Sequence, residues 1–166
     1  YNVTVRLIEN RGRDVSALLV GCKDIIHDYD LVCFTHDKKV TQVKPYSVGD
    51  GFAIKCFENL LATRDFVKNV IATFDAEPRL GLLAPTPPNH GDYFPVFSMG
   101  WGPNFERTKT LLEKELNLSV PIDESRAPIA PLGTMFWFRP AALKPLFDHD
   151  WQWEDFPPEP NNIDGT

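Results

Sequence analysis

A short apolar segment that runs directly into ionisable side chains constrains the fold of this chain more than any other feature. Residues 31–34 are Leu, Val, Cys and Phe, and residues 35–39 are Thr, His, Asp, Lys and Lys. A buried strand that ends in this way delivers charged groups to the edge of a sheet, where ligands bind in open α/β proteins. An acid beside two cations and an imidazole suits a polyanion, a metal ion or both. A lysine-rich surface loop is the alternative.

The residues before this segment predict a β-α-β unit. Residues 2–8 alternate polar and apolar side chains, as a half-buried strand does. A polar turn follows, Asp14 is a good N-cap, and apolar residues recur at helical spacing over 18–29. We therefore expect strands 2–8 and 31–34 to be parallel and joined by a right-handed crossover. The turn and the ionisable cluster would then lie at one edge of the sheet.

Other periodic segments predict the rest of the domain. Helical spacing recurs in three segments, which are 53–61, 65–74 and 105–115. Short apolar segments predict two further strands, at 80–84 and 134–138. Thr63 and Asn104 are the expected N-caps of the second and third helices, and Pro140 is expected to open another short helix.

Composition limits the class of protein. The chain has 166 residues, 43% of them hydrophobic, which suits one globular domain. A net charge of −6 argues against a general nucleic-acid binder. The three cysteines lie in apolar patterns without a CxxC spacing, which favours reduced thiols in the cytoplasm. The chain begins without Met and stops without a terminal element, so we expect a single domain, 1–166, truncated at both ends.

Asn10, Arg11, Gly12, Arg13 and Asp14 form the first constellation that could carry chemistry. Backbone N–H groups and the dipole of the following helix favour an anion here, and two arginines add bidentate phosphate recognition. A capped turn with solvated arginines is the alternative, and it is favoured when the turn is considered alone.

Carboxylates alternate with aromatic side chains from Asp148 to Asp164. Ring faces stack on sugar C–H faces, carboxylates accept hydrogen bonds from hydroxyls, and one carboxylate can remove a hydroxyl proton. This pattern favours a sugar site over an acidic surface segment with aromatic anchors. In the strand at 134–138 most side chains are expected in the core. Gly133 would allow close approach of a ligand, and Arg139 would face that ligand.

Several motifs follow one another in order along the chain. They are Glu9–Asp14, Phe34–Lys39, Gly81–Pro85, Gly133–Pro140, Glu154–Pro157 and Ile163–Thr166. Together they resemble the rhamnan synthesis protein F family of bacterial polysaccharide-assembly glycosyltransferases, over essentially the whole chain. The resemblance implies an α/β fold with a Rossmann-like, GT-A-type sheet and flanking helices, lacking its first strands. It also implies a nucleotide-sugar donor, with rhamnose as the expected sugar, and a glycan or lipid-linked glycan acceptor.

The resemblance assigns donor-side roles. The strand that ends at Asp37 takes the place of an Asp-x-Asp motif that holds a divalent metal, so Asp37 is the expected ligand of Mg²⁺ or Mn²⁺. Only one acid is present here, so metal dependence is left open. The expected donor and phosphate ligands are His36, Lys38 and Lys39, together with the turn at 10–14.

The resemblance also assigns acceptor-side roles. Asp155 is expected to deprotonate the acceptor hydroxyl, with Glu154 as the second candidate. The residue patterns of the tail and of the strand at 134–138 add the expected residues that bind the acceptor sugar, which are Gly133, Arg139, Trp151, Trp153 and Asp164.

Two other classes stay open. One is a non-catalytic carbohydrate- or protein-binding module of a larger polysaccharide-assembly protein. The other is a sugar nucleotidyltransferase, which shares the sheet architecture but normally has a glycine-rich N-terminal loop that this sequence lacks. For the enzyme we expect no nucleic-acid partner and no transmembrane segment in this chain. We expect a cytoplasmic location, at the inner face of the membrane through the parent protein.

Overall fold

The central strand of a small sheet organises the molecule. The computed structural model describes residues 2–37, 47–86, 100–131 and 133–160. Within these, β1 (Val32–Phe34), β3 (Phe136–Phe138) and β2 (Leu82–Leu83) form a three-stranded sheet in the order β1-β3-β2. Both pairings are antiparallel. Every side chain of β3 is buried, because neighbouring strands and covering helices enclose it.

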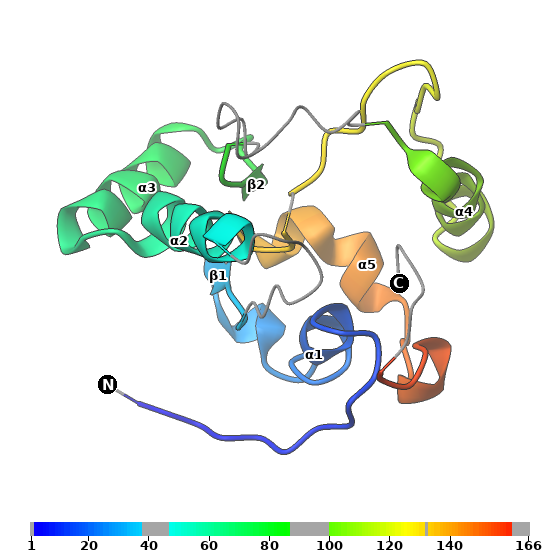
Figure 1. Ribbon diagram of the computed structural model, residues 1–166, viewed down its shortest axis with the longest axis horizontal. Helices are drawn as coiled ribbons and strands as arrows, with labels where there is room; N and C mark the ends of the chain where they lie inside the picture. Colours follow the sequence, from blue (N-terminus) through cyan, green and yellow to red (C-terminus); the bar gives the residue numbers. More distant parts are fainter. Residues whose placement is uncertain (1, 38–46, 87–99, 132, 161–166) are drawn as a thin grey trace.

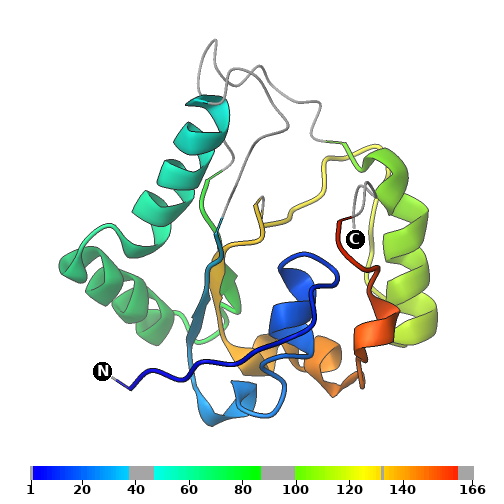
Figure 2. The same ribbon diagram turned by 60° about the horizontal axis from the view of Figure 1, so that its bottom comes forward.

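Helices cover both faces of the sheet, as Figures 1 and 2 show. The helix pair α2 (Ser47–Leu61) and α3 (Arg64–Ala76) lies on one face. On the other face lie α1 (Val15–Leu19), the 3-10 turn η1 (Ile26–Asp28) and α5 (Lys144–Asp148). This is a mixed α/β arrangement in three layers.

Alternation along β3 supplies both halves of the core. Phe136 and Phe138 pack with residues of the α1 and α5 layer, including Leu18 and Phe147. Met135 and Trp137 point to the opposite face and pack among residues of α2 and α3. The Trp137 indole Nε1 donates a hydrogen bond to the Leu60 carbonyl, at 3.0 Å in a buried position. One short strand therefore anchors both helical layers.

The predicted strands at 31–34, 80–84 and 134–138 are confirmed, each in shorter form. The helix pair is confirmed too, and the Thr63 hydroxyl accepts a hydrogen bond from the Phe66 N–H, as an N-cap does. Pro140 opens the 3-10 turn η5 (Pro140–Leu143). The predicted helix at 105–115 is α4 (Phe105–Thr110) and a π-helical turn, η4 (Leu111–Glu115).

The predicted β-α-β unit is wrong. Residues 2–10 are exposed and form no strand in the described structure, with Leu7 99% exposed. The only neighbour of β1 in the described sheet is β3, which is antiparallel to it. Alternating side chains make a segment compatible with pairing, but they do not choose a partner.

The helix predicted over 14–29 is also shorter than expected. α1 ends at Leu19, where the N–H groups of Val20 and Gly21 both donate to the Ser16 carbonyl. A Cβ added at Gly21 would lie 2.7 Å from the Ala17 carbonyl oxygen, so glycine suits this helix end. Asp14 and Asn104 occupy the predicted N-cap positions of α1 and α4, but neither side chain forms a capping hydrogen bond.

None of the helices in the described part of the chain is long and apolar enough to cross a membrane. The cysteines are free thiols, as predicted from the sequence. Cys56 is buried, and burial raises the pKa of Cys33 to about 12 and raises the pKa of Cys22.

Cys33 should therefore be nearly inert in the folded protein. A pKa near 12 lowers the thiolate fraction of Cys33 at pH 8 by about a thousandfold relative to an ordinary thiol. We expect N-ethylmaleimide to label Cys33 at least about a hundredfold more slowly in native protein than in urea, because the thiolate is the form that reacts. Mass spectrometry of timed digests measures both rates. Native labelling at the rate of free glutathione would contradict the expected burial.

Candidate functional site

The turn at 10–14 and the acidic tail meet, and we call residues 10–14 with residues 153–159 the turn–tail junction. The Gly12 N–H donates to the Pro157 carbonyl at 2.9 Å, and the Glu159 N–H donates to the Asn10 carbonyl at 3.0 Å. Arg11 and Pro158 form an isolated antiparallel bridge. Backbone hydrogen bonds therefore join the predicted phosphate turn to the predicted catalytic segment.

Gly12 makes this close approach feasible. Its φ is +59°, in the left-handed region, and Arg13 beside it has a φ of +56°. A Cβ built on Gly12 would lie 2.6–2.9 Å from atoms of the Phe156 side chain. Phe156 is buried and belongs to the core that contains Phe136 and Phe138. Only glycine combines this backbone conformation with this contact.

Arg11 is tied to the tail through its side chain. Its Nε donates to the carbonyls of Trp153 and Phe156, at 2.7 and 2.8 Å. The Arg11 carbonyl in turn accepts a hydrogen bond from the hydroxyl of Ser16, whose side chain is fully buried. The Arg13 N–H donates to Glu159 Oε1 at 3.1 Å. Arg11 and Ser16 therefore connect the start of α1 to the tail.

His36 brings the end of β1 to the same region. Its Nε2 lies 2.8 Å from the Gly133 carbonyl and 3.5 Å from Asp14 Oδ2, and its Nδ1 lies 2.8 Å from the Asp37 carbonyl. Asp14 Oδ2 is buried and accepts no hydrogen bond from any described group. The structure therefore brings His36, Asp14 and Gly133 together, although no strand pairing of residues 2–8 is involved.

An apolar cavity of about 320 Å³ opens beside the tail. Its polar lining residues are Asp155 and Thr134, and Trp151, Phe156 and Leu111 form part of its apolar wall. Leu111 begins the π-helical turn η4, a feature frequent at functional sites. A carboxylate at the edge of an apolar wall can accept a hydroxyl proton while the wall packs against the ring that carries it.

The tail is held in a defined turn. Asp155 ends the 3-10 turn η6 (Trp153–Asp155), and its Oδ2 accepts a hydrogen bond from the Gln152 N–H at 2.8 Å. Trp151 donates through Nε1 to the Leu146 carbonyl at 2.8 Å, and its ring centroid lies 5.6 Å from that of Phe156. Asp155 and Glu154 are exposed, whereas Trp151 and Trp153 are half-buried.

A salt bridge joins the start of the tail to the segment after α1. Lys23 Nζ lies 2.9 Å from Asp150 Oδ1, and this hydrogen bond lowers the pKa of Asp150. Both side chains are largely exposed, so the pair contributes little to stability.

Arg139 does not join this cluster. It follows β3 at the end opposite to Gly133, where its Nη2 donates to the Phe74 carbonyl at 2.7 Å and its Nε to the Leu80 carbonyl at 3.2 Å. Its guanidinium also lies 5.4 Å from the Phe74 ring centroid. In this structure Arg139 connects β3 to the end of α3.

The other predicted residues include three whose position the structure does not describe. Lys38, Lys39 and Asp164 lie outside the described residues. Asp37 is exposed, and among the described side chains no group of three or more His, Cys, Asp or Glu could hold a metal ion. Mg²⁺ and Mn²⁺ prefer several oxygen ligands, so Asp37 would need others from substrate or water.

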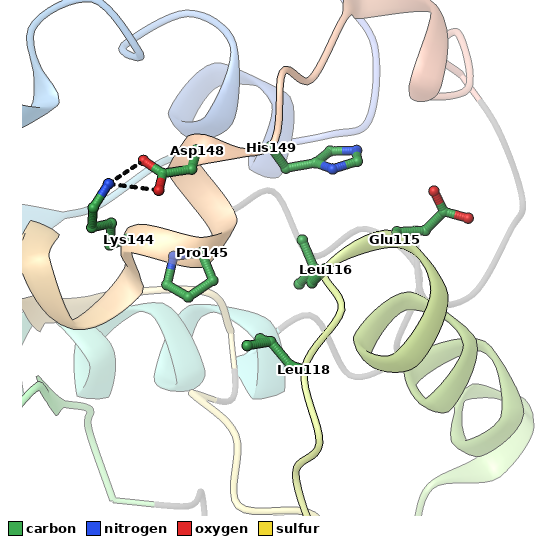
Figure 3. A pocket seen from close by; sticks show the side chains of 7 residues that line it. All are labelled: Glu115, Leu116, Leu118, Lys144, Pro145, Asp148 and His149. Atoms are coloured by element: carbon green, nitrogen blue, oxygen red, sulfur yellow. Dashed lines mark hydrogen bonds and ion pairs between the residues drawn. The ribbon is translucent and has the colours of Figure 1, made fainter.

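A second cavity, of about 440 Å³, lies between η4 and α5 (Figure 3). Lys144 and Asp148 line one side, and Glu115, Leu116 and Leu118 line the other. Lys144 Nζ forms hydrogen bonds of 2.6 and 2.7 Å with the Asp148 carboxylate. Lys144 and Asp148 neutralise each other, and Asp148 is the member of the predicted carboxylate and aromatic pattern that lines this cavity together with His149.

Thr134 and Ser16 were not predicted as site residues. Thr134 lines the cavity and has a φ of +56°, directly after Gly133 with a φ of +85°. Its position in a Gly-Thr pair before a strand is a turn signal that could have identified it. Ser16 is a single serine in an apolar helical pattern, and nothing in its sequence context indicates its hydrogen bond to Arg11.

Fold and site together define a mixed α/β domain in which a turn, a strand end and an acidic tail converge next to an apolar cavity. The chain belongs to the rhamnan synthesis protein F family, whose family model matches residues 1–166. It is also similar to the uncharacterized protein WxcX of Xanthomonas campestris pv. campestris (strain B100), with 29% identity over 159 residues. That match covers 95% of this chain but only 21% of the relative. No solved structure matches. Family membership connects the chain with polysaccharide synthesis.

Proposed function

We propose that this chain supplies donor and acceptor groups of a glycosyltransferase that moves a sugar from a nucleotide donor to a glycan hydroxyl. Rhamnose is the proposed sugar, in keeping with the family description. The observation that carries the proposal is the turn–tail junction, since it connects a basic turn to Asp155 beside the 320 Å³ cavity. A GT-A-type domain is the proposed framework. The proposed location is the cytoplasm, at the inner face of the membrane.

The proposed chemistry is an inverting displacement. One carboxylate removes the proton of the acceptor hydroxyl, and positive groups stabilise the departing diphosphate. Asp155 is the proposed base, with Glu154 as its alternative. Arg13 and His36 are proposed to face the diphosphate, with Lys38 and Lys39. A divalent ion at Asp37, Mg²⁺ or Mn²⁺, would add positive charge there.

The acceptor is proposed to occupy the cavity next to Asp155. Its wall combines aromatic rings, Trp151 and Phe156, with aliphatic side chains. The C–H face of a sugar packs on such surfaces, and its hydroxyls need a small number of polar partners. Asp155 and Thr134 supply polar groups at this wall. Trp153, Gly133 and Asp164 are proposed to extend the acceptor site, and the acceptor is a glycan or a lipid-linked glycan.

A non-catalytic carbohydrate-binding module is the second candidate. The observation that favours it is the Asp155 carboxylate, which already accepts a hydrogen bond from the Gln152 N–H within the tail. A carboxylate in that structural role can bind a sugar hydroxyl without acting as a base.

Donor binding is the direct test. Thermal unfolding and ¹⁵N NMR of the full-length protein should be followed with dTDP-rhamnose, with free rhamnose as control, each with and without Mn²⁺. At 100 times Kd, binding stabilises the folded state by about 2.7 kcal/mol. We therefore expect Tm to rise by several degrees, and amide signals of Arg13, His36 and Asp37 to shift. If neither changes, the donor site is refuted. Binding without transfer to any glycan acceptor would favour the binding module.

A further inference from the structure

We infer that Arg11 is a positioning residue that holds the Trp153–Phe156 turn, and with it Asp155, at the cavity. It was predicted from the sequence to bind the donor diphosphate. The part of this inference that concerns catalysis rests on the proposed role of Asp155. The part that concerns the turn rests on geometry alone.

The first step is the direction of the Arg11 side chain. Its Nε carries one proton, and two carbonyl oxygens, those of Trp153 and Phe156, lie 2.7 and 2.8 Å from that nitrogen. These carbonyls belong to the residues on either side of Glu154 and Asp155. Hydrogen bonds from a charged donor are stronger than those between neutral groups. Arg11 therefore closes the turn that carries both carboxylates.

The second step is that Arg11 is itself held firmly. Its carbonyl accepts a hydrogen bond from the buried Ser16 hydroxyl, and the next residue, Gly12, donates its N–H to the Pro157 carbonyl. Arg11 and Pro158 pair as an isolated bridge. The side chain therefore extends from a fixed backbone toward the tail, with a half-buried stem.

The third step is that the other hydrogen bonds of the turn are local. η6 is a 3-10 turn of three residues in which Glu154 and Asp155 are exposed. Its internal hydrogen bonds include those of Asp155 N–H to the Gln152 carbonyl at 3.2 Å, Phe156 N–H to the Trp153 carbonyl at 3.1 Å and Gln152 N–H to Asp155 Oδ2 at 2.8 Å. Phe156 anchors its end in the core. Arg11 ties this turn to the segment before α1, so we expect Asp155 to move relative to the cavity wall when that contact is lost.

Kinetics distinguishes positioning from diphosphate binding. A misplacement of about 1 Å can lower a rate on the order of a hundredfold. In the Arg11→Met variant of the full-length protein we therefore expect kcat for sugar transfer to fall about a hundredfold. The Kd of dTDP-rhamnose should stay within about twofold of the wild-type value, because the substitution removes no contact with the donor. A diphosphate ligand would give a donor Kd raised about tenfold or more with the turn unchanged, and that result would overturn the inference. Arg11→Lys provides the same comparison if Arg11→Met folds poorly.

A second measurement needs no donor. In protein labelled with 5-fluorotryptophan, the ¹⁹F signal of Trp153, assigned by Trp153→Phe, reports the turn directly. We expect this signal to shift or broaden in Arg11→Met and Arg11→Lys. Trp137→Phe is the matched control, because it also removes a side-chain donor to a backbone carbonyl, that of Leu60, in the other half of the core. It should lower Tm without moving the Trp153 signal.

The two measurements separate the possible failures. If wild-type protein neither binds dTDP-rhamnose nor transfers sugar, the proposed function fails. The ¹⁹F signal still tests whether Arg11 fixes the conformation of the turn. If that signal is the same in wild type, Arg11→Met and Arg11→Lys, the inference fails whatever the enzyme does.

Discussion

Replacing Gly12 with alanine should lower the free energy of unfolding by about 3 kcal/mol, the combined effect of two separate penalties. The left-handed backbone, with a φ of +59°, costs a residue with a Cβ about 1 to 2 kcal/mol. The new methyl group would lie 2.6–2.9 Å from Phe156 atoms, and overpacking of this kind costs about 1 to 3 kcal/mol. Urea denaturation of wild type and variant measures the loss.

Gly51→Ala is the matched control for this substitution. Gly51 lies inside α2, and a Cβ added there would meet nothing within 4 Å. Alanine is a better helix former than glycine, so this variant should be more stable by about 0.5 to 1 kcal/mol. In a double-mutant cycle, Phe156→Leu should recover part of the loss caused by Gly12→Ala, because the two side chains would compete for the same space. A Gly12→Ala variant as stable as wild type would refute the close packing at the turn–tail junction.

Local chemistry made part of the fold predictable. The strand at 134–138 was predicted because it is apolar and aromatic throughout, and in the structure β3 is the buried centre of the sheet. Thr63 was predicted as a cap from its position before a helical pattern, and its hydroxyl accepts the Phe66 N–H. In both cases the residue types within a short segment are sufficient to predict its local structure.

Pairing between distant segments was not predictable in the same way. Residues 2–8 have the alternation of a strand, yet they are exposed and form no strand in the described part of the chain, where β1 pairs with β3. A period of two specifies which side chains share a face, and leaves the partner strand undetermined. Parallel pairing was inferred from order along the chain, and the observed pairing is antiparallel.

The candidate site shows the same limit. Arg11 and Gly12 were predicted to belong to a site, and the structure connects them to a tail more than 140 residues away. The partners of Arg11 are backbone carbonyls, which every residue carries, so no residue type in the tail indicates the contact. Similarly, the basic turn suggested a phosphate site, although the sequence could not reveal that the Arg11 Nε is committed to the tail.

Replacing Asp155 with asparagine should reduce sugar transfer by the full protein about 10² to 10⁴-fold, the range expected for loss of a general base. Asparagine has nearly the same shape, and its side-chain oxygen can still accept the Gln152 N–H that Asp155 Oδ2 accepts now. The fold of the turn should therefore persist. The Tm should change by no more than about one or two degrees, as is usual for a substitution of an exposed residue. Donor affinity should also be unchanged, because the base acts on the acceptor. Initial rates at saturating donor measure the effect.

Asp150→Asn is the matched control for Asp155→Asn, since Asp150 is an exposed carboxylate of the same tail that pairs with Lys23. Hydrogen bonding to Lys23 lowers the pKa of Asp150, so its share of stability is present at neutral pH and decreases as the pH falls through that lowered pKa. Its loss should leave the transfer rate unchanged at pH 7. If Glu154→Gln abolishes transfer and Asp155→Asn does not, the base is Glu154. If neither substitution lowers the rate, the tail carries no base, and the carbohydrate-binding alternative gains support.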